Sequence, residues 1–183
     1  MAGRLVLVVG PSGAGKDTLI AAAKTALAGD ARYVFPKRVI TRPAMAEAED
    51  HESVSPERFA ELKAAGAFAL DWDAHGLSYG LPASLRDDLA AGRTVVFNGS
   101  RAAVAEARRR FEALTVVLVE ATPEVRAARL AGRGRESAAE IAERLKREVR
   151  DPLPDAVVVD NSGPLASGVA AFVAALGTSN AEV

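Results

Sequence analysis

The chain is 183 residues long, with 49% hydrophobic and 26% charged residues, which fits one globular domain with a sizeable core. Its formal net charge of -1 argues against a general nucleic-acid or membrane-surface binder, and its lack of cysteine excludes disulfides, thiolate catalysis and zinc–thiolate sites. No apolar run approaches the ~20 residues of a membrane span, and the glycines from Gly10 onward begin too early for a signal-peptide core. We therefore expect a cytoplasmic protein without nucleic-acid or membrane partners.

Apolar runs and capping signals predict strands that alternate with helices along the chain. Continuous apolar runs, typical of parallel strands covered on both faces, occupy residues 5–9, 94–97, 115–119 and 156–159. Helices are expected over residues 17–27 and 101–111, from 122, from 137 to about 150, and over 164–176. The segment from Ser137 to Glu140 has the spacing of a capping box. This alternation predicts an α/β fold with a doubly wound parallel sheet.

The stretch over about residues 38–80 interrupts the alternation and is more polar. It holds both histidines and a helix that is expected to begin at Ser55. We expect this stretch to be an insertion over the carboxyl edge of the sheet, where ligands bind in open α/β folds. The whole chain, residues 1–183, is expected to form one domain.

A glycine-rich segment directly follows the first predicted strand and opens the first predicted helix. It reads Gly10-Pro11-Ser12-Gly13-Ala14-Gly15-Lys16, which is the P-loop pattern G-x-x-x-x-G-K in the context of strand, loop and helix. Glycines let the backbone curl so that successive N–H groups point at phosphate oxygens, and the helix N-terminus adds partial positive charge. Lys16 can reach the β- and γ-phosphates of a nucleotide. The segment therefore predicts a binding site for a nucleoside triphosphate, with ATP as the expected phosphoryl donor.

Asp17 stands where the P-loop pattern has a Ser or Thr that holds magnesium, and Thr18 follows one place late. A carboxylate beside a triphosphate is repelled unless a cation lies between them. We therefore expect Asp17 to contact Mg²⁺, directly or through a water. The alternative is an acid in the first helical turn whose role is only to interact favourably with the helix dipole.

Several segments beyond the P-loop carry a family resemblance. Thr41-Arg42-Pro43 resembles a shortened form of the Thr-Thr-Arg-x-Pro-Arg segment of guanylate kinases, and Asp50-His51-Glu52-Ser53-Val54-Ser55 resembles their Asp-Tyr-x-Phe-Val-Ser segment. Leu70-Asp71-Trp72 and Gly76-Leu77-Ser78-Tyr79-Gly80 are similar to the next acceptor-binding segment. Asn98-Gly99-Ser100-Arg101 stands where guanylate kinases have Asp-x-Asp, and it resembles instead the bacterial ribose 1,5-bisphosphate phosphokinases.

The order and spacing of these segments resemble the guanylate kinase superfamily, and within it the ribose 1,5-bisphosphate phosphokinases of phosphonate metabolism. The resemblance implies a three-layer P-loop kinase fold with a central parallel sheet, an acceptor-binding insertion and an arginine-bearing lid over about residues 130–150. It also implies ATP and Mg²⁺ as cofactors and a small phosphorylated metabolite as acceptor. The implied reaction transfers the γ-phosphoryl group to the 1-phosphate of ribose 1,5-bisphosphate and yields 5-phosphoribosyl 1-diphosphate.

Phosphoryl transfer depends mostly on positioning and charge neutralisation, and a phosphate acceptor is already ionised, so that it needs no general base. Arginine suits this task because its planar fork binds phosphate oxygens in pairs. The expected catalytic residues are Lys16, Arg101, Arg133 and Arg135. The donor is expected to contact the segment from Gly10 to Thr18 and also Arg129. The resemblance implies that the acceptor contacts Arg42, His51, Asp71, Tyr79 and Arg101.

Two other functions stay open on the sequence. One is a divergent guanylate kinase or another nucleoside monophosphate kinase, although an arginine is missing after Pro43 and acids are missing around Asn98. The other is a non-catalytic guanylate-kinase-like interaction module, which would be expected to lose the phosphate loop that is intact here. At the level of single residues, Asp71 and Tyr79 have the alternative of a hydrogen-bonded pair that only shapes a loop.

Overall fold

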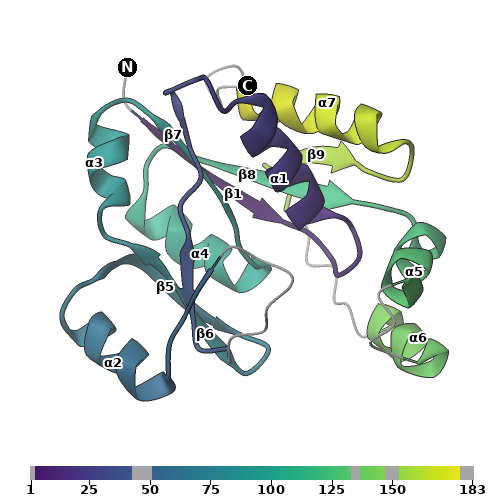
Figure 1. The fold of residues 1–183 in the computed structure, drawn as a ribbon, viewed down its shortest axis with the longest axis horizontal. Helices are drawn as coiled ribbons and strands as arrows, with labels where there is room; N and C mark the ends of the chain where they lie inside the picture. The colour runs from purple at the N-terminus through teal and green to yellow at the C-terminus, as the bar shows by residue number, and fades with distance from the viewer. Residues whose placement is uncertain (1–2, 43–50, 133–136, 147–152, 178–183) are drawn as a thin grey trace. The chain divides into compact units, whose positions relative to one another are not determined.

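Strands and helices alternate along most of the chain (Figure 1). The computed structural model describes residues 3–42, 51–132, 137–146 and 153–177. The chain divides into two compact units, of which unit 1 comprises Met1–Leu7 and Leu27–Thr115. Unit 2 comprises Val8–Ala26 and Val116–Val183. Strand β1 (Arg4–Val9) therefore contributes to both units.

A five-stranded sheet has the strand order β2-β7-β1-β8-β9. The bounds of its other strands are β2 (Tyr33–Val34), β7 (Thr94–Asn98), β8 (Leu114–Glu120) and β9 (Val157–Asp160). Strand β2 pairs with β7, and β8 pairs with β9, in the parallel sense. The apolar run of β1, from Leu5 to Val9, is fully buried. Because strands covered on both faces read as continuous apolar runs, the predicted α/β fold with a parallel sheet is confirmed.

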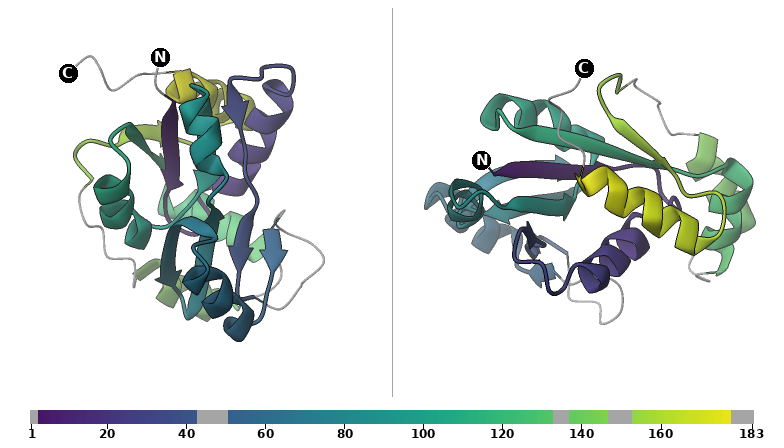
Figure 2. Two further views of the ribbon diagram at one scale, coloured as in Figure 1. Left: turned by 90° about the vertical axis from the view of Figure 1, so that its left-hand side faces the viewer. Right: turned by 90° about the horizontal axis from the view of Figure 1, so that it is seen from above.

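Unit 2 holds four helices among its described residues: α1 (Lys16–Ala26), α5 (Pro123–Gly132), α6 (Ala138–Lys146) and α7 (Leu165–Gly177). Helices α1 and α7 lie side by side, and α7 also packs against β9 (Figure 2). Leu19 of α1 and Phe172 of α7 are completely buried and form part of the core of this unit. Helix α5 packs against α6. In the part of the chain that the structure describes, no helix combines the length and the apolar character that crossing a bilayer requires.

The capping box predicted at residues 137–140 is present at the start of α6. The N–H of Ser137 donates to Glu140 Oε2 at 2.7 Å, and the N–H of Glu140 donates to Ser137 Oγ at 3.3 Å. The N–H and the hydroxyl of Ser137 lower the pKa of the Glu140 carboxyl. These reciprocal bonds satisfy amide groups that a helix start leaves without intrahelical partners.

The polar stretch of unit 1 forms a four-stranded sheet, which the sequence analysis did not predict. Its strand order is β4-β3-β6-β5, with β3 (Arg38–Ile40), β4 (His51–Ser53), β5 (Phe68–Ala74) and β6 (Leu77–Pro82). Strand β3 pairs with β4 in parallel, whereas β6 pairs with both β3 and β5 in the antiparallel sense. Helices α2 (Pro56–Ala64), α3 (Leu85–Ala90) and α4 (Arg101–Arg110) complete the unit. The predicted helix start is confirmed, since Ser55 Oγ accepts the N–H of Arg58 at 3.2 Å.

The two faces of this small sheet carry different side chains. Trp72 of β5 stands opposite Tyr79 of β6, and their rings stack with centroids 5.3 Å apart. Asp71 stands opposite Gly80, and neighbouring residues of a strand point to opposite faces. Asp71 and Tyr79 therefore lie on opposite faces, so they do not form the direct pair that the sequence left open.

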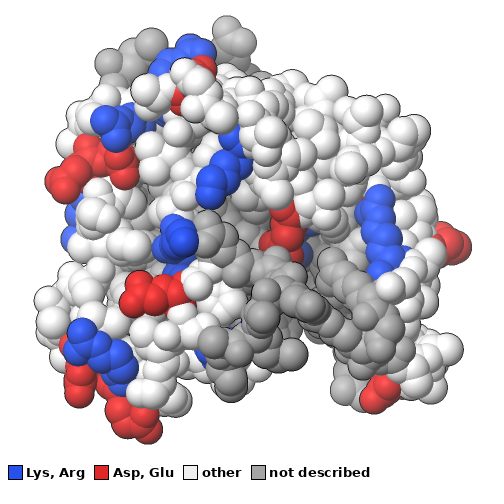
Figure 3. All heavy atoms as spheres, viewed as in Figure 1, with Lys and Arg blue, Asp and Glu red and all other residues white. Residues whose placement is uncertain are grey.

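Charged side chains of both signs are interspersed over α2 and α3 (Figure 3). Within α2, Arg58 Nη1 lies 2.9 Å from Glu61 Oε2. At the end of α3, Arg93 Nη1 lies 2.7 Å from Asp88 Oδ1. Exposed pairs of this kind contribute about 0–1 kcal/mol each, so they keep the surface mixed in charge without deciding the fold.

Candidate functional site

The phosphate loop of unit 2 connects β1 with α1. Gly13 and Gly15 have φ values of +80° and +94°, in the left-handed region that other residues rarely adopt. The N–H of Ala14 donates to Pro11 O at 3.2 Å and forms a tight turn inside the loop. The N–H of Leu19 donates to Gly15 O at 3.0 Å and begins the hydrogen bonds of α1. Gly13 and Gly15 therefore adopt backbone conformations that favour glycine over every other residue.

Lys16 folds back along the loop. Its Nζ donates to Gly10 O at 2.7 Å and to Pro11 O at 3.3 Å, so the ammonium group is held at the start of the loop. A flexible lysine in this place can exchange carbonyl oxygens for phosphate oxygens, because both are hydrogen-bond acceptors.

Asp17 and Thr18 occupy the first turn of α1, where Asp17 is half-buried and Thr18 is exposed. An acid there interacts favourably with the helix dipole, and its oxygens are also the donors that Mg²⁺ prefers. Among the described residues, no group of three or more histidines and acids could hold a metal ion. A single carboxylate still fits Mg²⁺, which is usually bound by one or two carboxylates together with substrate phosphates and waters.

Besides Lys16, three side chains from other elements hold carbonyl oxygens of the phosphate loop, and only Arg129 among these three was predicted from the sequence. Arg126 of α5 is 2% exposed, and its Nε donates to Ser12 O at 2.9 Å. Arg129, one turn later, donates from Nη1 to Ala14 O at 3.1 Å. Asn161, which follows β9 and is also 2% exposed, donates from Nδ2 to Ala14 O at 2.8 Å. Two helical turns of α5 and the end of β9 thus support the loop.

The backbone around Asn161 is fixed by a compact turn. The hydroxyl of Ser162 donates to Asp160 Oδ1 at 2.5 Å and its N–H donates to the same oxygen at 2.9 Å, which together lower the pKa of the Asp160 carboxyl. Ser162 Oγ in turn accepts the N–H of Thr122 at 3.0 Å. The N–H of Asn161 donates to Glu120 O at 2.7 Å. These bonds join the ends of β8 and β9 and set the place from which the Asn161 side chain reaches the loop.

The predicted arginine-bearing lid can be described in part. Helices α5 and α6 cover most of the predicted range, and Arg129 lies on α5 with its second amino group donating to Asn161 O at 2.7 Å. Arg133 and Arg135 lie outside the described residues, so their predicted catalytic roles stay predictions. The contact of Arg129 with the loop carbonyls places its guanidinium beside the predicted donor site.

Most of the side chains predicted for the acceptor lie in the small sheet of unit 1. The register pairs Arg38 with His51 and Ile40 with Tyr79, which places His51, Tyr79 and Arg38 on one face. The Arg38 guanidinium lies 5.6 Å from the centre of the Tyr79 ring, and His51 Nε2 lies 3.1 Å from Ser53 Oγ. Arg42 follows the end of β3 and is half-buried. Arg38 is therefore an additional candidate that no sequence motif indicated.

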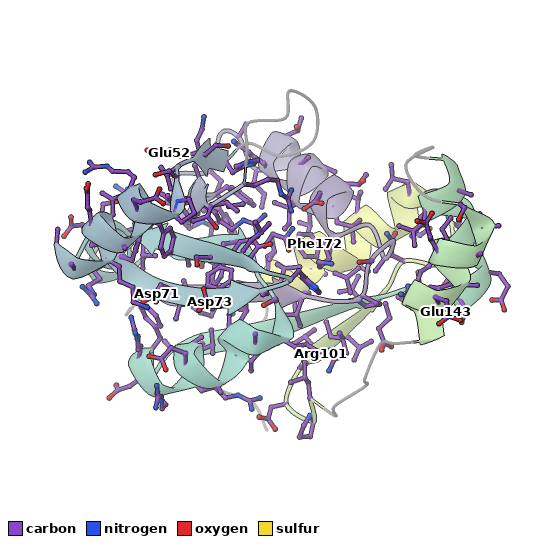
Figure 4. All side chains as sticks on the ribbon, turned by 90° about the horizontal axis from the view of Figure 1, so that it is seen from below. Glu52, Asp71, Asp73, Arg101, Glu143 and Phe172 are labelled. Carbon is purple, nitrogen blue, oxygen red and sulfur yellow. The ribbon has the colours of Figure 1, made fainter. Side chains whose placement is uncertain are left out.

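Asp71 does not share that face. Its carboxylate lies 2.5 Å from Lys63 Nζ and 3.6 Å from Arg110 Nη2, so two cations neutralise it. Figure 4 shows Asp71 and Asp73 on β5 and Arg101 at the start of α4. The structure thus brings His51 and Tyr79 together with Arg38, and it separates them from Asp71.

The chain is similar to known proteins over most of its length. No protein-family model matches the chain. The chain is 50% identical over 173 residues to the ribose 1,5-bisphosphate phosphokinase PhnN of Brucella melitensis. These residues cover 93% of this chain and 90% of that protein. It is 57% identical over 168 residues to the protein of the same name from Acidiphilium cryptum, with 92% and 90% covered.

A solved structure shares the fold. The crystal structure of guanylate kinase from Anaplasma phagocytophilum aligns with a TM-score of 0.65, covering 98% of this chain and 89% of that chain. The sequences are 18% identical, so the likeness concerns the fold alone.

Proposed function

The chain belongs to the ribose 1,5-bisphosphate phosphokinase family, and we propose that it transfers the γ-phosphoryl group of ATP to the 1-phosphate of ribose 1,5-bisphosphate. The products are 5-phosphoribosyl 1-diphosphate and ADP. An oxygen of the 1-phosphate forms a bond to the γ-phosphorus, and the bond between that phosphorus and the bridging oxygen of ADP breaks. The observation that carries the proposal is the phosphate loop, whose backbone and lysine fit a nucleoside triphosphate.

In this proposal the donor site holds the phosphates of ATP and neutralises their negative charge. The loop N–H groups and the N-terminus of α1 hold the phosphates, and Lys16 exchanges its bonds to Gly10 O and Pro11 O for phosphate oxygens. Asp17 is the residue that would hold Mg²⁺, which when bound neutralises charge between the donor phosphates. Arg129 adds a second fixed positive charge beside the loop.

The acceptor needs cations more than it needs a base. Its phosphate oxygens are ionised near neutral pH, so attack requires no general base, but two polyanions must approach each other. We assign Arg42, Arg101, His51 and Tyr79 to the acceptor, as the resemblance implies. The sheet register gives less support to Asp71, since its carboxylate is on the other face and is paired with Lys63.

The test measures ADP release from Mg–ATP with separate acceptors: ribose 1,5-bisphosphate, ribose 5-phosphate, GMP and AMP. Phosphorus NMR then identifies the product by its diphosphate on the sugar. We expect turnover with ribose 1,5-bisphosphate and little with GMP, and a Lys16→Met variant should lose the turnover with ribose 1,5-bisphosphate. Preferred turnover of GMP would reject the proposed acceptor and favour a nucleotide kinase.

A further inference from the structure

We infer that Arg126 and Asn161 are positioning residues that aim the N–H groups of the phosphate loop by holding its carbonyl oxygens from the opposite side. The inference rests on the proposed function in one respect, namely that the loop binds a nucleoside di- or triphosphate. Arg126 donates to Ser12 O and Asn161 donates to Ala14 O, at 2.9 and 2.8 Å. Neither residue belongs to the P-loop motif, and neither needs to touch the nucleotide.

The geometry of the peptide bond converts these contacts into an orientation. In a planar trans peptide the C=O group and the N–H group of the next residue point in opposite directions. Fixing Ser12 O therefore fixes the N–H of Gly13, and fixing Ala14 O fixes the N–H of Gly15. Since Gly13 and Gly15 have left-handed φ angles, these peptides would otherwise rotate easily. Preorganised N–H donors bind phosphate better because their reorientation costs nothing on binding.

The burial of Arg126 indicates that its guanidinium group has a hydrogen-bonding role in addition to packing. A guanidinium that is 2% exposed is costly unless its donors are satisfied, and this one bonds a loop carbonyl. Arg126 and Arg129 are three residues apart and lie on one face of α5. Together these two cations hold the carbonyl oxygens of Ser12, Gly13 and Ala14. Because both guanidinium groups contact the loop, their positive charge also attracts an anion that binds to the N–H groups of the loop.

Asn161 is held in place by contacts that leave little room. A Cβ added to Gly15 would lie 2.5 Å from Asn161 Nδ2, and a Cβ added to Gly168 of α7 would overlap Asn161 Oδ1. The Asp160–Ser162 turn fixes its backbone. Gly168 therefore offers a way to displace the Asn161 amide without removing a polar group.

The experiment measures the Kd of Mg–ADP by calorimetry without any acceptor, and then KM for ATP and for ribose 1,5-bisphosphate. Arg126→Met and Asn161→Asp should weaken Mg–ADP binding by roughly tenfold or more, and Arg126→Lys should recover part of the loss because its ammonium group is still a positively charged N–H donor. Gly168→Ala should match Asn161→Asp. Gly163→Ala is the control, since nothing lies within 4 Å of its added Cβ, and it should bind as wild type.

Two readouts separate positioning from general destabilisation. KM for ATP should rise while KM for ribose 1,5-bisphosphate stays unchanged. Asn161→Asp should also regain affinity as the pH falls, because a protonated carboxyl can again donate to Ala14 O. Folded variants of Arg126 and Gly168 that bind Mg–ADP within twofold of wild type would overturn the inference. A wild type that binds Mg–ADP but does not phosphorylate ribose 1,5-bisphosphate would reject the proposed acceptor only, since the binding comparison needs no acceptor.

Discussion

Replacing Gly15 with alanine measures how tightly the phosphate loop fits its support. Gly15 has φ of +94°, where a residue with a Cβ is strained by roughly 1–2 kcal/mol. The added Cβ would lie 2.5 Å from Asn161 Nδ2, so the amide must move and weaken its bond to Ala14 O, at a cost of about 1 kcal/mol. The two effects together should lower the free energy of unfolding by about 2–3 kcal/mol.

Thermal unfolding followed by circular dichroism measures this loss. In a chain of 183 residues each kcal/mol shifts Tm by roughly 2–4 °C, so we expect Gly15→Ala to lower Tm by roughly 4–12 °C. Gly76→Ala is the matched control, because Gly76 has φ of +74° but nothing within 4 Å of an added Cβ. It should show the backbone strain alone, roughly 1–2 kcal/mol. Equal losses in the two variants would refute the reasoning, because the contact with Asn161 would then contribute nothing.

Three further predictions concern the metal, the acceptor and pH. Asp17→Asn should raise the Mg²⁺ concentration needed for half-maximal activity by roughly tenfold in a titration at fixed ATP, and an unchanged requirement would remove the metal role. Arg42→Ala and Arg101→Ala should each raise the acceptor KM or lower kcat by roughly 10- to 100-fold, since bonds to charged groups contribute ~1.5–3 kcal/mol; near-normal steady-state kinetics in both would contradict the acceptor assignment. The hydroxyl and N–H of Ser162 hold the pKa of Asp160 below its ordinary value of 3.8, so the stability it contributes is complete above that value and is lost as the pH falls through the lower folded-state pKa. Urea unfolding of wild type and Asp160→Asn should therefore differ at about pH 6 and converge as the pH falls below 3.8; a constant difference would show that the carboxylate charge does not matter.

The phosphate loop could be predicted because its chemistry is local. The residues from Gly10 to Lys16 carry the turn, the left-handed backbone and the cation within one short segment. The buried strands were equally accessible, since a parallel strand covered on both faces needs an unbroken apolar run. Strand β1 has such a run, and it is fully buried from Leu5 to Val9.

The support of the loop could not be read from the sequence in the same way. Arg126 and Asn161 bond to loop carbonyls that are 114 and 147 residues away in the chain. Every residue has a main-chain carbonyl, so a bond to a carbonyl does not require any particular residue type in the loop. No sequence motif therefore reveals these bonds. One signal was present: Arg126 lies four residues before the buried Leu130, at the spacing of the covered face of a helix. An arginine at such a position is a candidate for a buried hydrogen-bonding role.

The small sheet of unit 1 was missed for a different reason. Leu70 and Trp72 alternate with Asp71 and Asp73, which is the period of a half-buried strand. Continuous apolar runs indicate only strands that are covered on both faces, so four strands of the larger sheet were predicted, whereas its two-residue strand β2 and the whole small sheet were not. The resemblance also assigned Asp71 and Tyr79 to one site, whereas the strand register separates their side chains.

The number of residues in the turn between β5 and β6 determines which side chains of the two strands lie on the same face of the sheet. Its turn consists of His75 and Gly76, with φ values of +53° and +74°, and Ala74 pairs directly with Leu77. Unless a bulge absorbs it, one residue inserted here would shift the pairing by one place, and one of the two strands would exchange its faces. Tyr79 would then share a face with Asp71 rather than with Trp72. In this architecture an insertion or deletion in a single turn would therefore change which side chains share a face of the sheet, without any substitution in the two strands.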